Sequence, residues 1–179
     1  LDLIAITTGF GNASVSDTTR NAIYMKELFN MSAAVYAGAA MPVGSALGEG
    51  YADFVHGKNG LGDIPLTTPM CEAEAMPAAE AIVELVRANP HALSVVAVGR
   101  MTNLAMALAL DPELPSLVKE LIVMGGVFGY NGHRGNVSPV AEANIAGDPL
   151  AADRVFSSGI PTTIVGLDVT AETVMNEAY

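Results

Sequence analysis

The chain has 179 residues, of which 51% are hydrophobic, and a formal net charge of −11 at pH 7. That length is enough for one domain with a substantial core, and the hydrophobic content excludes a disordered chain. The negative charge argues against a nucleic-acid surface, because few cations could neutralise phosphates. The apolar runs are too short to cross a bilayer. The single cysteine, Cys71, excludes an internal disulfide and fits a cytoplasmic protein.

Short apolar runs bounded by glycine or turn residues predict buried strands at 3–8, 34–37, 93–98, 120–124 and 162–166. Apolar residues at helical spacing predict helices at 16–28, 74–88, 104–108 and 149–158. Strands that alternate with helices indicate parallel βαβ units with right-handed crossovers. The predicted fold is an open, mostly parallel α/β sheet with helices on both faces.

The two ends of the chain look cut. The sequence begins inside the first strand pattern without an initiator methionine, and residues 171–175 read as a helix just beginning. We therefore expect one domain over residues 1–179, truncated at both ends and incomplete as a sheet.

A long irregular segment follows the fourth predicted strand. Gly125 and Gly126 allow a sharp turn as the chain leaves that strand. Pro139 prevents helix formation in the middle of the next twenty or so residues. Long loops in compact domains are usually functional, and open α/β sheets bind ligands at the carboxyl ends of their strands. This loop is therefore the main candidate for a binding site.

Three polar residues of this loop, Asn136, Glu142 and Asn144, are short hydrogen-bonding groups among small apolar residues. If residues 142–144 are extended, the side chains of Glu142 and Asn144 lie on the same side. A carboxylate with two carboxamides suits a ligand that carries several hydroxyls, such as a sugar. The alternative is that these groups only hydrogen-bond the backbone of their own loop.

Other polar residues also follow strands or glycine turns, namely Asn12, His56 and Thr102. In a parallel sheet they could converge at one edge. Taken singly, Asn12 fits a turn, His56 a solvated loop, and Thr102 a helix cap. The backbone carbonyl of Thr102 could also serve a hard cation such as Ca²⁺, but only with carboxylates from elsewhere.

The start of the chain half-matches a dinucleotide-binding fingerprint. Gly9 and Gly11 lie between a strand and a helix, but Ser14 stands in the place of the third glycine. The second predicted strand also lacks the acidic residue that would bind a ribose. A dinucleotide-dependent α/β enzyme is therefore a minor alternative.

Several motifs, taken together and in order, resemble the inosine-uridine-preferring nucleoside hydrolases. The motifs are Ile6–Thr8, Gly11–Asn12, Thr18–Asn21, His56–Gly62, Val98–Ala105, Val123–Gly126, Gly135–Ile145 and Gly166–Thr170. The resemblance implies an enzyme that hydrolyses the N-glycosidic bond of ribonucleosides to free base and ribose, with Ca²⁺ as cofactor. It also implies an open, largely parallel α/β sheet and a homodimer or homotetramer when the protein has its full length.

The resemblance also implies roles for individual residues. Thr102 would give its backbone carbonyl to Ca²⁺, while Asn12 and Asn144 would orient the ribose diol and the attacking water. The general base and the leaving-group acid of the family would lie outside this chain, which would be inactive alone. A non-catalytic relative that binds nucleoside or ribose is therefore a further alternative.

Four other positions complete the implied substrate site. Asn136 and Glu142 would bind toward the 5′-hydroxyl, Met124 would pack against the ribose, and His56 would lie near the base. The sequence departs from the family at two further positions. Ala143 stands where many members have phenylalanine, and Arg100 stands where many have proline.

Overall fold

The computed structural model describes residues 2–44 and 51–176, and in this part of the chain all strand pairings within the two sheets are parallel. The strands are β1 (Ala5–Thr7), β2 (Ala34–Tyr36), β3 (Ser94–Ala97), β4 (Glu120–Met124) and β5 (Thr162–Val165). The helices are α1 (Val15–Leu28), α2 (Asp53–His56), α3 (Ala78–Ala88), α4 (Thr102–Leu110), α5 (Leu114–Leu117), α6 (Ala143–Ala146), α7 (Pro149–Phe156) and α8 (Leu167–Thr170), with a 3-10 turn η1 (Tyr130–Gly132). The predicted parallel α/β class is confirmed.

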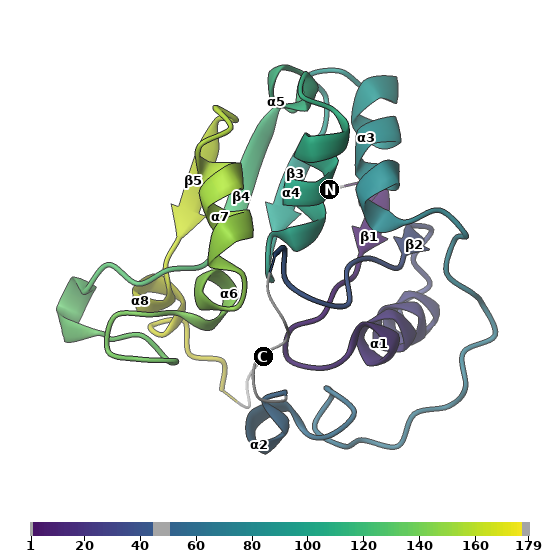
Figure 1. The fold of residues 1–179 in the computed structure, drawn as a ribbon. Coiled ribbons are helices and arrows are strands. Elements are labelled where there is room, and N and C mark those ends of the chain that lie inside the picture. The colour runs from purple at the N-terminus through teal and green to yellow at the C-terminus, as the bar shows by residue number, and fades with distance from the viewer. Residues whose placement is uncertain (1, 45–50, 177–179) are drawn as a thin grey trace.

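The strands form two hydrogen-bonded groups, β1–β2 and β3–β4–β5. The register aligns Ile6 with Val35 in the first group, and Val96 with Ile122 and Thr163 across the second. Figure 1 shows the strands from left to right in the order β5, β4, β3, β1, β2, all pointing downwards. Their carboxyl ends therefore lie on the same side of the molecule, together with α2, α6 and α8.

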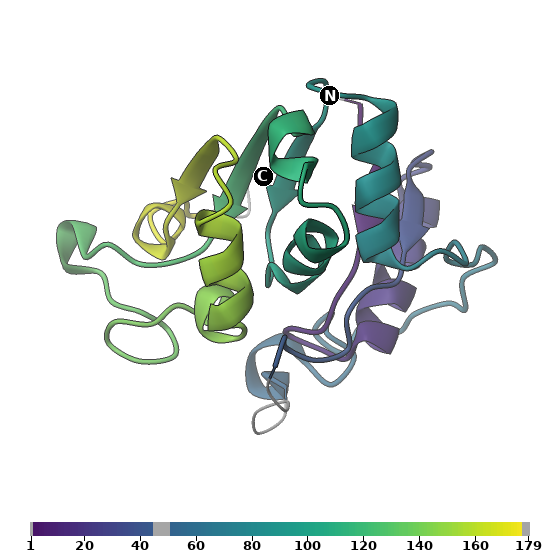
Figure 2. The same ribbon diagram turned by 45° about the horizontal axis from the view of Figure 1, so that its top comes forward.

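The helices cover one face of the larger sheet. Figures 1 and 2 show α4 and α7 on the near side of β3, β4 and β5, with α3 beside α4. Leu121 and Val123 of β4 are fully buried under these helices, in a core that also contains Leu114 and Val155. A smaller apolar cluster joins α1 to β1 and β2. The other face of this sheet is partly exposed in the described part of the chain, where Val96 of β3 and Ile164 of β5 are 59% and 40% exposed.

Sequence pattern located the long elements closely and missed the short ones. The predicted strand 120–124 is β4 itself, and the predicted helix at residue 74 begins later, at Ala78. Pro77 occupies the N-cap position of α3, so its missing N–H costs no helical hydrogen bond. The one-turn helices α2, α5, α6 and α8 are too short to give a periodic signal. No helix in the described ranges has the length and apolarity to cross a membrane.

An ion pair fixes the end of α3 to the segment after α4. The guanidinium of Arg87 donates to both carboxylate oxygens of Asp111, at 2.6 and 2.7 Å, and to Glu113 at 3.1 Å. The side chain of Asp111 is only 5% exposed, whereas that of Glu113 is 76% exposed. The hydrogen bonds from Arg87 hold the pKa of Asp111 below its ordinary value.

We predict that Asp111→Asn lowers the thermal midpoint at pH 7. A carboxylate whose folded pKa is depressed stabilises the protein above the unfolded pKa of about 3.9, and this stabilisation disappears as pH falls through the folded pKa. The gap between wild type and variant should therefore close at acidic pH, as measured by circular dichroism melts from pH 7 to pH 2.5. Glu113→Gln is the control and should have the smaller effect. A gap that stays constant down to pH 2.5 would contradict this account.

Candidate functional site

The carboxyl ends of the two strand groups are tied together by Asn103, the second residue of α4. Its Nδ2 donates to the carbonyl of Thr8 at 2.8 Å, and its Oδ1 accepts from the N–H of Ala39 at 2.8 Å. A Cβ at Gly38 would lie 2.2 Å from that Oδ1, so only glycine allows this approach. The Asn103 side chain thereby joins three strand ends, and it brings the loop containing Asn12 to the start of α4.

Asn144 connects the carboxyl ends of β3 and β4. Its Nδ2 donates to the carbonyl of Met124 at 3.0 Å and lies 3.5 Å from the carbonyl of Val98. The same nitrogen lies 3.3 Å from the sulfur of Met124. Within the described residues its Oδ1 accepts no hydrogen bond. Asn144 and Asn12 thus lie at the same edge of the sheet, as predicted, and Asn144 has a free acceptor there.

Glu142 is committed to the backbone of its own loop. Its side chain accepts from the N–H groups of Asn144, Ile145 and Gly126, at 2.8, 3.2 and 3.0 Å, and the residue is 3% exposed. These bonds make Glu142 the N-cap of α6. The extended arrangement considered for residues 142–144 is wrong, because a buried carboxylate that caps the helix makes the next residues turn.

Asn136 also bonds its own loop. Its Oδ1 accepts from the N–H of Ala143 at 2.9 Å, and the residue is exposed. A Cβ at Gly135 would lie 2.2 Å from the carbonyl of Ala141, so the two arms of the loop approach at a glycine. Asn136 and Glu142 therefore hydrogen-bond the backbone of their own loop, which was the alternative that the sequence left open. Their contacts to a substrate stay predictions.

A second carboxylate, Asp168, holds the other side of this loop. Its Oδ2 accepts from the N–H groups of Phe128 and Tyr130 at 3.1 and 3.0 Å, and the residue is 1% exposed. Burial raises the pKa of Asp168, but the hydrogen bonds from Tyr130 and Phe128 outweigh this and lower it. Sequence reasoning assigned no role to Asp168, since nothing in a pattern reveals a bond across 40 residues.

Asp148 connects three distant segments beneath the site. Its Oδ1 accepts from the N–H of Ala151 and caps α7, which begins at Pro149. Its Oδ2 accepts from the N–H of Val43 at 2.9 Å and from the hydroxyl of Thr102 at 2.6 Å. Thr102 and Asp148 are 3% and 1% exposed. The residue predicted as a cation ligand is thereby fixed in orientation through its side chain.

Arg100, one of the two departures from the family pattern, lies next to this cluster. Its guanidinium carbon is 4.4 Å from the ring centroid of Phe10, in the loop that contains Asn12. Burial lowers the pKa of Arg100, while the charge of Asp148 opposes that shift. A Cβ at Gly147 would lie 2.0 Å from Nε of Arg100. The arginine therefore occupies space that a glycine leaves open, and it packs the loops after β1 and β3 together.

His56 is the predicted site residue that the described contacts do not join to the others. It ends α2 and is partly buried, and its carbonyl accepts from the N–H of Gly62 at 2.7 Å. Asn59 folds the following turn by accepting from the N–H groups of Leu61 and Asp63. In the described ranges no hydrogen bond joins the His56 side chain to another residue, so its place near a base stays a prediction.

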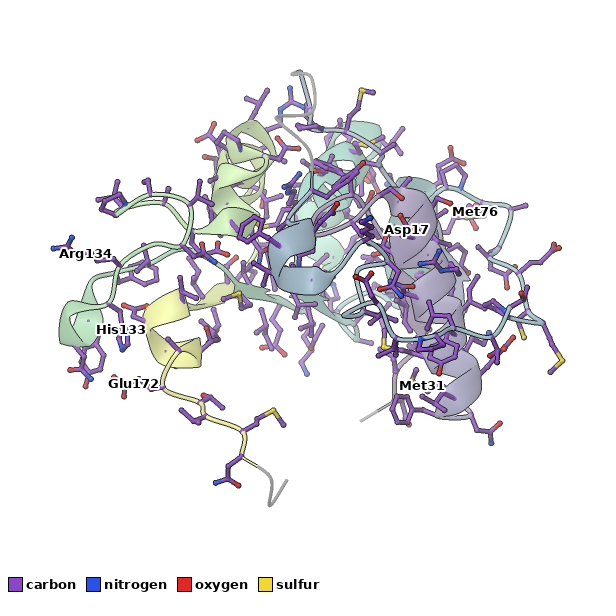
Figure 3. All side chains as sticks on the ribbon, turned by 90° about the horizontal axis from the view of Figure 1, so that it is seen from below. Asp17, Met31, Met76, His133, Arg134 and Glu172 are labelled. Atoms are coloured by element: carbon purple, nitrogen blue, oxygen red, sulfur yellow. The ribbon has the colours of Figure 1, made fainter. Side chains whose placement is uncertain are left out.

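The tip of the long loop is fixed away from the site. The side chains of Asn131 and His133 both contact Glu172 after α8, at 2.6 and 3.3 Å. Figure 3 shows His133 and Glu172 side by side at the outer end of the loop. Hydrogen bonds, the larger effect from Asn131 and the smaller from His133, lower the pKa of Glu172. His133 thus stabilises the tip of the loop, and among the described residues no hydrogen bond joins it to Asn12 or Asn144.

The described residues do not by themselves fit a calcium ion. Ca²⁺ takes six to eight oxygen ligands, usually with carboxylates among them. No group of three or more histidine, cysteine, aspartate or glutamate side chains in the described ranges could hold a metal ion. The carboxylates of Asp148, Glu142 and Asp168 already accept from hydroxyl or backbone N–H donors. The carbonyl of Thr102 remains a single candidate ligand.

Neither of two prominent cavities among the described residues contains the whole predicted site. A cavity of ≈ 430 Å³ lies between α1 and residues 69–73 and contains none of the predicted residues. A second, of ≈ 320 Å³, lies under the long loop against Glu142, Ile145 and Phe156. Its lining is mostly apolar, so we assign the polar site to the strand ends and not to either cavity.

The fold and site define an α/β protein that places carboxamides at the carboxyl edge of parallel strands. A family model for inosine-uridine preferring nucleoside hydrolases matches residues 1–179. The chain therefore belongs to the inosine-uridine-preferring nucleoside hydrolase family, as its motifs predicted.

Named relatives agree with this assignment. The chain is 41% identical to uridine nucleosidase 1 from Arabidopsis thaliana over 99% of its own length and 52% of the relative's. It is 38% identical to a non-specific ribonucleoside hydrolase (RihC) from Escherichia coli, over all of this chain and 57% of the relative. The chain thus spans about half the length of the curated relatives it matches.

Solved structures show the same fold. A plant nucleoside hydrolase superposes with a TM-score of 0.90 at 37% identity, over 96% of this chain and 54% of the other. A purine-preferring ribonucleoside hydrolase from Gardnerella vaginalis superposes with a TM-score of 0.91 at 36% identity, over 97% and 55%. The described residues therefore have the fold of the matching portions of these longer hydrolases.

We predict that Asp148→Ala lowers the free energy of unfolding by about 2–4 kcal/mol, because it removes a helix cap and leaves buried donors of Val43 and Thr102 unpaired. The measurement is urea unfolding followed by circular dichroism. Asp153→Ala is the matched control on the same helix, because Asp153 is exposed. Equal losses in the two variants would contradict the role assigned to Asp148.

Proposed function

We propose that this chain is part of a ribonucleoside hydrolase, which hydrolyses the N-glycosidic bond to give free base and ribose. The single observation that carries the proposal is the position of Asn144. Its amide nitrogen bonds the carbonyl of Met124, and its own carbonyl is left free at the same sheet edge as Asn12. Two carboxamides at one edge match the neighbouring hydroxyls of a ribose. Membership of the family favours this function over that of a dinucleotide-dependent enzyme.

In this proposal Asn12 and Asn144 orient the ribose diol, and Met124 provides an apolar surface for the sugar. Asn12 is exposed and makes no hydrogen bond to another described residue, so its amide is available to a ligand. Glu142 and Asn136 shape the loop through backbone N–H groups and face the 5′-hydroxyl from there. His56 lies toward the base, at the start of the turn that Asn59 stabilises.

The family is metal-dependent in general, and we propose Ca²⁺ as the metal of the intact parent. Thr102 would contribute its carbonyl, and the remaining ligands would come from outside residues 1–179, since the described residues do not fit the ion alone. The same proposal includes a cytoplasmic location and a homodimer or homotetramer for the full-length protein. The named relatives act on different nucleosides, including uridine and purine ribonucleosides, so no base preference is assigned.

A chimera tests the proposal directly. Residues 1–179 replace the matched 178 residues of uridine nucleosidase 1 from Arabidopsis thaliana. We expect the chimera to release ribose from uridine or inosine, and the 179-residue chain alone to release none above background. Ribose release is measured by a reducing-sugar assay. A folded chimera that binds nucleoside without turnover would identify a non-catalytic relative, and turnover by the chain alone would show that the catalytic groups lie within it.

Substitutions in the chimera separate ribose contacts from base contacts. Asn12→Ala and Asn144→Ala should each lower kcat/KM by about three- to tenfold, because a hydrogen bond between a carboxamide and a hydroxyl, both neutral, is worth roughly 1 kcal/mol. The loss should be equal for uridine, inosine and cytidine, since ribose is common to all three. His56→Ala should instead change the ratio among the three substrates. Values within about twofold of the parent chimera for both asparagine variants would refute the ribose contacts.

A further inference from the structure

The carbonyl of Asn59 accepts hydrogen bonds from two side chains of α1. Nδ2 of Asn21 donates to it at 2.8 Å, and Nη2 of Arg20 donates to it at 3.2 Å. The same nitrogen of Arg20 also donates to Oδ1 of Asn21 at 3.0 Å, so the two donors orient each other. These bonds join the first half of α1 to the turn that follows His56, 38 residues further along the chain.

Asn21 is buried in order to make this contact. The residue is only 5% exposed, and it lies on a face of α1 that also buries Ala22 and Ile23. Among the described residues its side chain bonds only the carbonyl of Asn59 and the guanidinium of Arg20. A polar group is costly to bury without partners. The turn after His56 therefore explains why a carboxamide occupies this apolar helix face.

Arg20 is oriented from the start of the same helix. Its Nη1 lies 2.9 Å from Oδ1 of Asp17, and Oδ2 of Asp17 accepts from the hydroxyl of Ser14 at 2.6 Å. Ser14 is the N-cap of α1 and lies two residues after Asn12. A series of polar contacts thus runs from the loop that contains Asn12 to the turn that follows His56.

The turn itself is a compact unit that includes His56. Oδ1 of Asn59 accepts from the N–H groups of Leu61 and Asp63, both at 2.9 Å. The N–H of Gly62 donates to the carbonyl of His56 at 2.7 Å, which closes the unit. Because residues 56–63 are bonded to one another, a bond to the carbonyl of Asn59 positions all of them.

Gly60 brings this turn into contact with the loop that contains Asn12. Its φ is +75°, and a Cβ at this position would lie 2.9 Å from Cβ of Ala13 and 3.3 Å from Nδ2 of Asn21. A larger residue would push the turn away from both. The turn of His56 therefore packs directly against the residue that follows Asn12.

We propose that Arg20 and Asn21 are positioning residues that hold the turn of residues 56–63 against the loop of Asn12, and so fix His56 relative to the ribose-binding residues. The inference rests on the proposed function, in which His56 lies toward the base and Asn12 contacts the ribose. Neither residue of α1 touches the substrate, because both act through the carbonyl of Asn59. Selectivity among nucleosides then depends on a helix outside the binding site.

A purely structural role for Asn21 has different consequences. A general loss of stability lowers the amount of folded protein and reduces activity with every nucleoside by the same factor. A displaced turn affects the substrates unequally, since His56 is the group on the side of the base. Ala22→Gly is the matched control, because it weakens the same helix at a buried position without removing a donor to Asn59.

The kinetic test uses variants of the chimera. Asn21→Ala should change the ratio of kcat/KM for inosine to that for uridine by about threefold or more, in the same direction as His56→Ala, which is the size of effect that one neutral hydrogen bond allows. Arg20→Ala should act in the same direction, and Ala22→Gly should leave the ratio unchanged. In a His56→Ala background, Asn21→Ala should no longer change the ratio, because the group that it positions is gone.

Proteolysis supplies a measurement that does not need turnover. Lys58 is exposed and lies within the turn, and trypsin cleaves after lysine where a segment can open locally. We expect cleavage after Lys58 to be about threefold or more faster in the Asn21→Ala chimera, the opening expected from the loss of about one hydrogen bond. Cleavage after Arg134, in the long loop, should be unchanged, and Ala22→Gly should leave the ratio of the two rates unchanged. The rates are measured by mass spectrometry of the released peptides.

Three results would overturn the inference. They are an unchanged cleavage rate after Lys58 in Asn21→Ala, an unchanged ratio between inosine and uridine in that variant, and an equal change of this ratio with or without His56. An active chimera with any of these results refutes the positioning role alone and leaves the proposed function intact. A chimera that binds nucleosides without turnover refutes hydrolysis, and the ratio of its Kd values for inosine and uridine then replaces kcat/KM. A chimera that binds neither refutes the proposed function and the role of His56 together.

Discussion

The site depends first on the carboxylate of Asp148. It is almost completely buried, and each of its three hydrogen bonds comes from a different part of the chain: the segment after β2, the start of α4, and α7. A buried acceptor is costly unless it is satisfied, and its donors are equally costly if it is removed. Asp148 therefore sets the position of Thr102 from 46 residues away in sequence. The same carboxylate caps α7 and orients the predicted cation ligand.

The long loop after β4 is organised by the same kind of contact. Glu142 binds the N–H of Gly126 near the loop's beginning, and Asp168 binds the N–H groups of Phe128 and Tyr130 further along. A segment without helix or strand would otherwise leave its backbone donors to water. Two nearly buried carboxylates satisfy them from opposite sides and give the loop one defined conformation. That conformation places Asn144 across the ends of β3 and β4, so its carbonyl is oriented before any ligand arrives.

The packing around Arg100 shows how a family site tolerates a departure. A proline at this position would restrict the backbone before Thr102 but would carry no charge. The arginine instead covers the ring of Phe10 and lies against Gly147 and near Asp148. It therefore connects the loop that contains Asn12 with the segment just before Thr102 and α4, at the edge where the candidate substrate residues meet. The structure gives no comparable account of Ala143, which contributes its N–H to Asn136.

The sequence by itself determined the fold class, the parallel strands and the family. These follow from local pattern, because a short apolar run between glycines has few alternatives to a buried strand and the motifs occur in a fixed order. It also predicted that Asn12, Thr102 and Met124 lie on one side, since strand direction fixes the side on which the strands end, whereas the conformation of the long loop places Asn144 there. Only the tertiary structure decided which polar atoms are already used and which are free. The carboxylates of Asp148, Glu142 and Asp168 accept hydrogen bonds from partners that lie 2 to 105 residues away in sequence. Such pairing depends on how the elements pack, because the sequence around a carboxylate does not show which backbone amide it will contact.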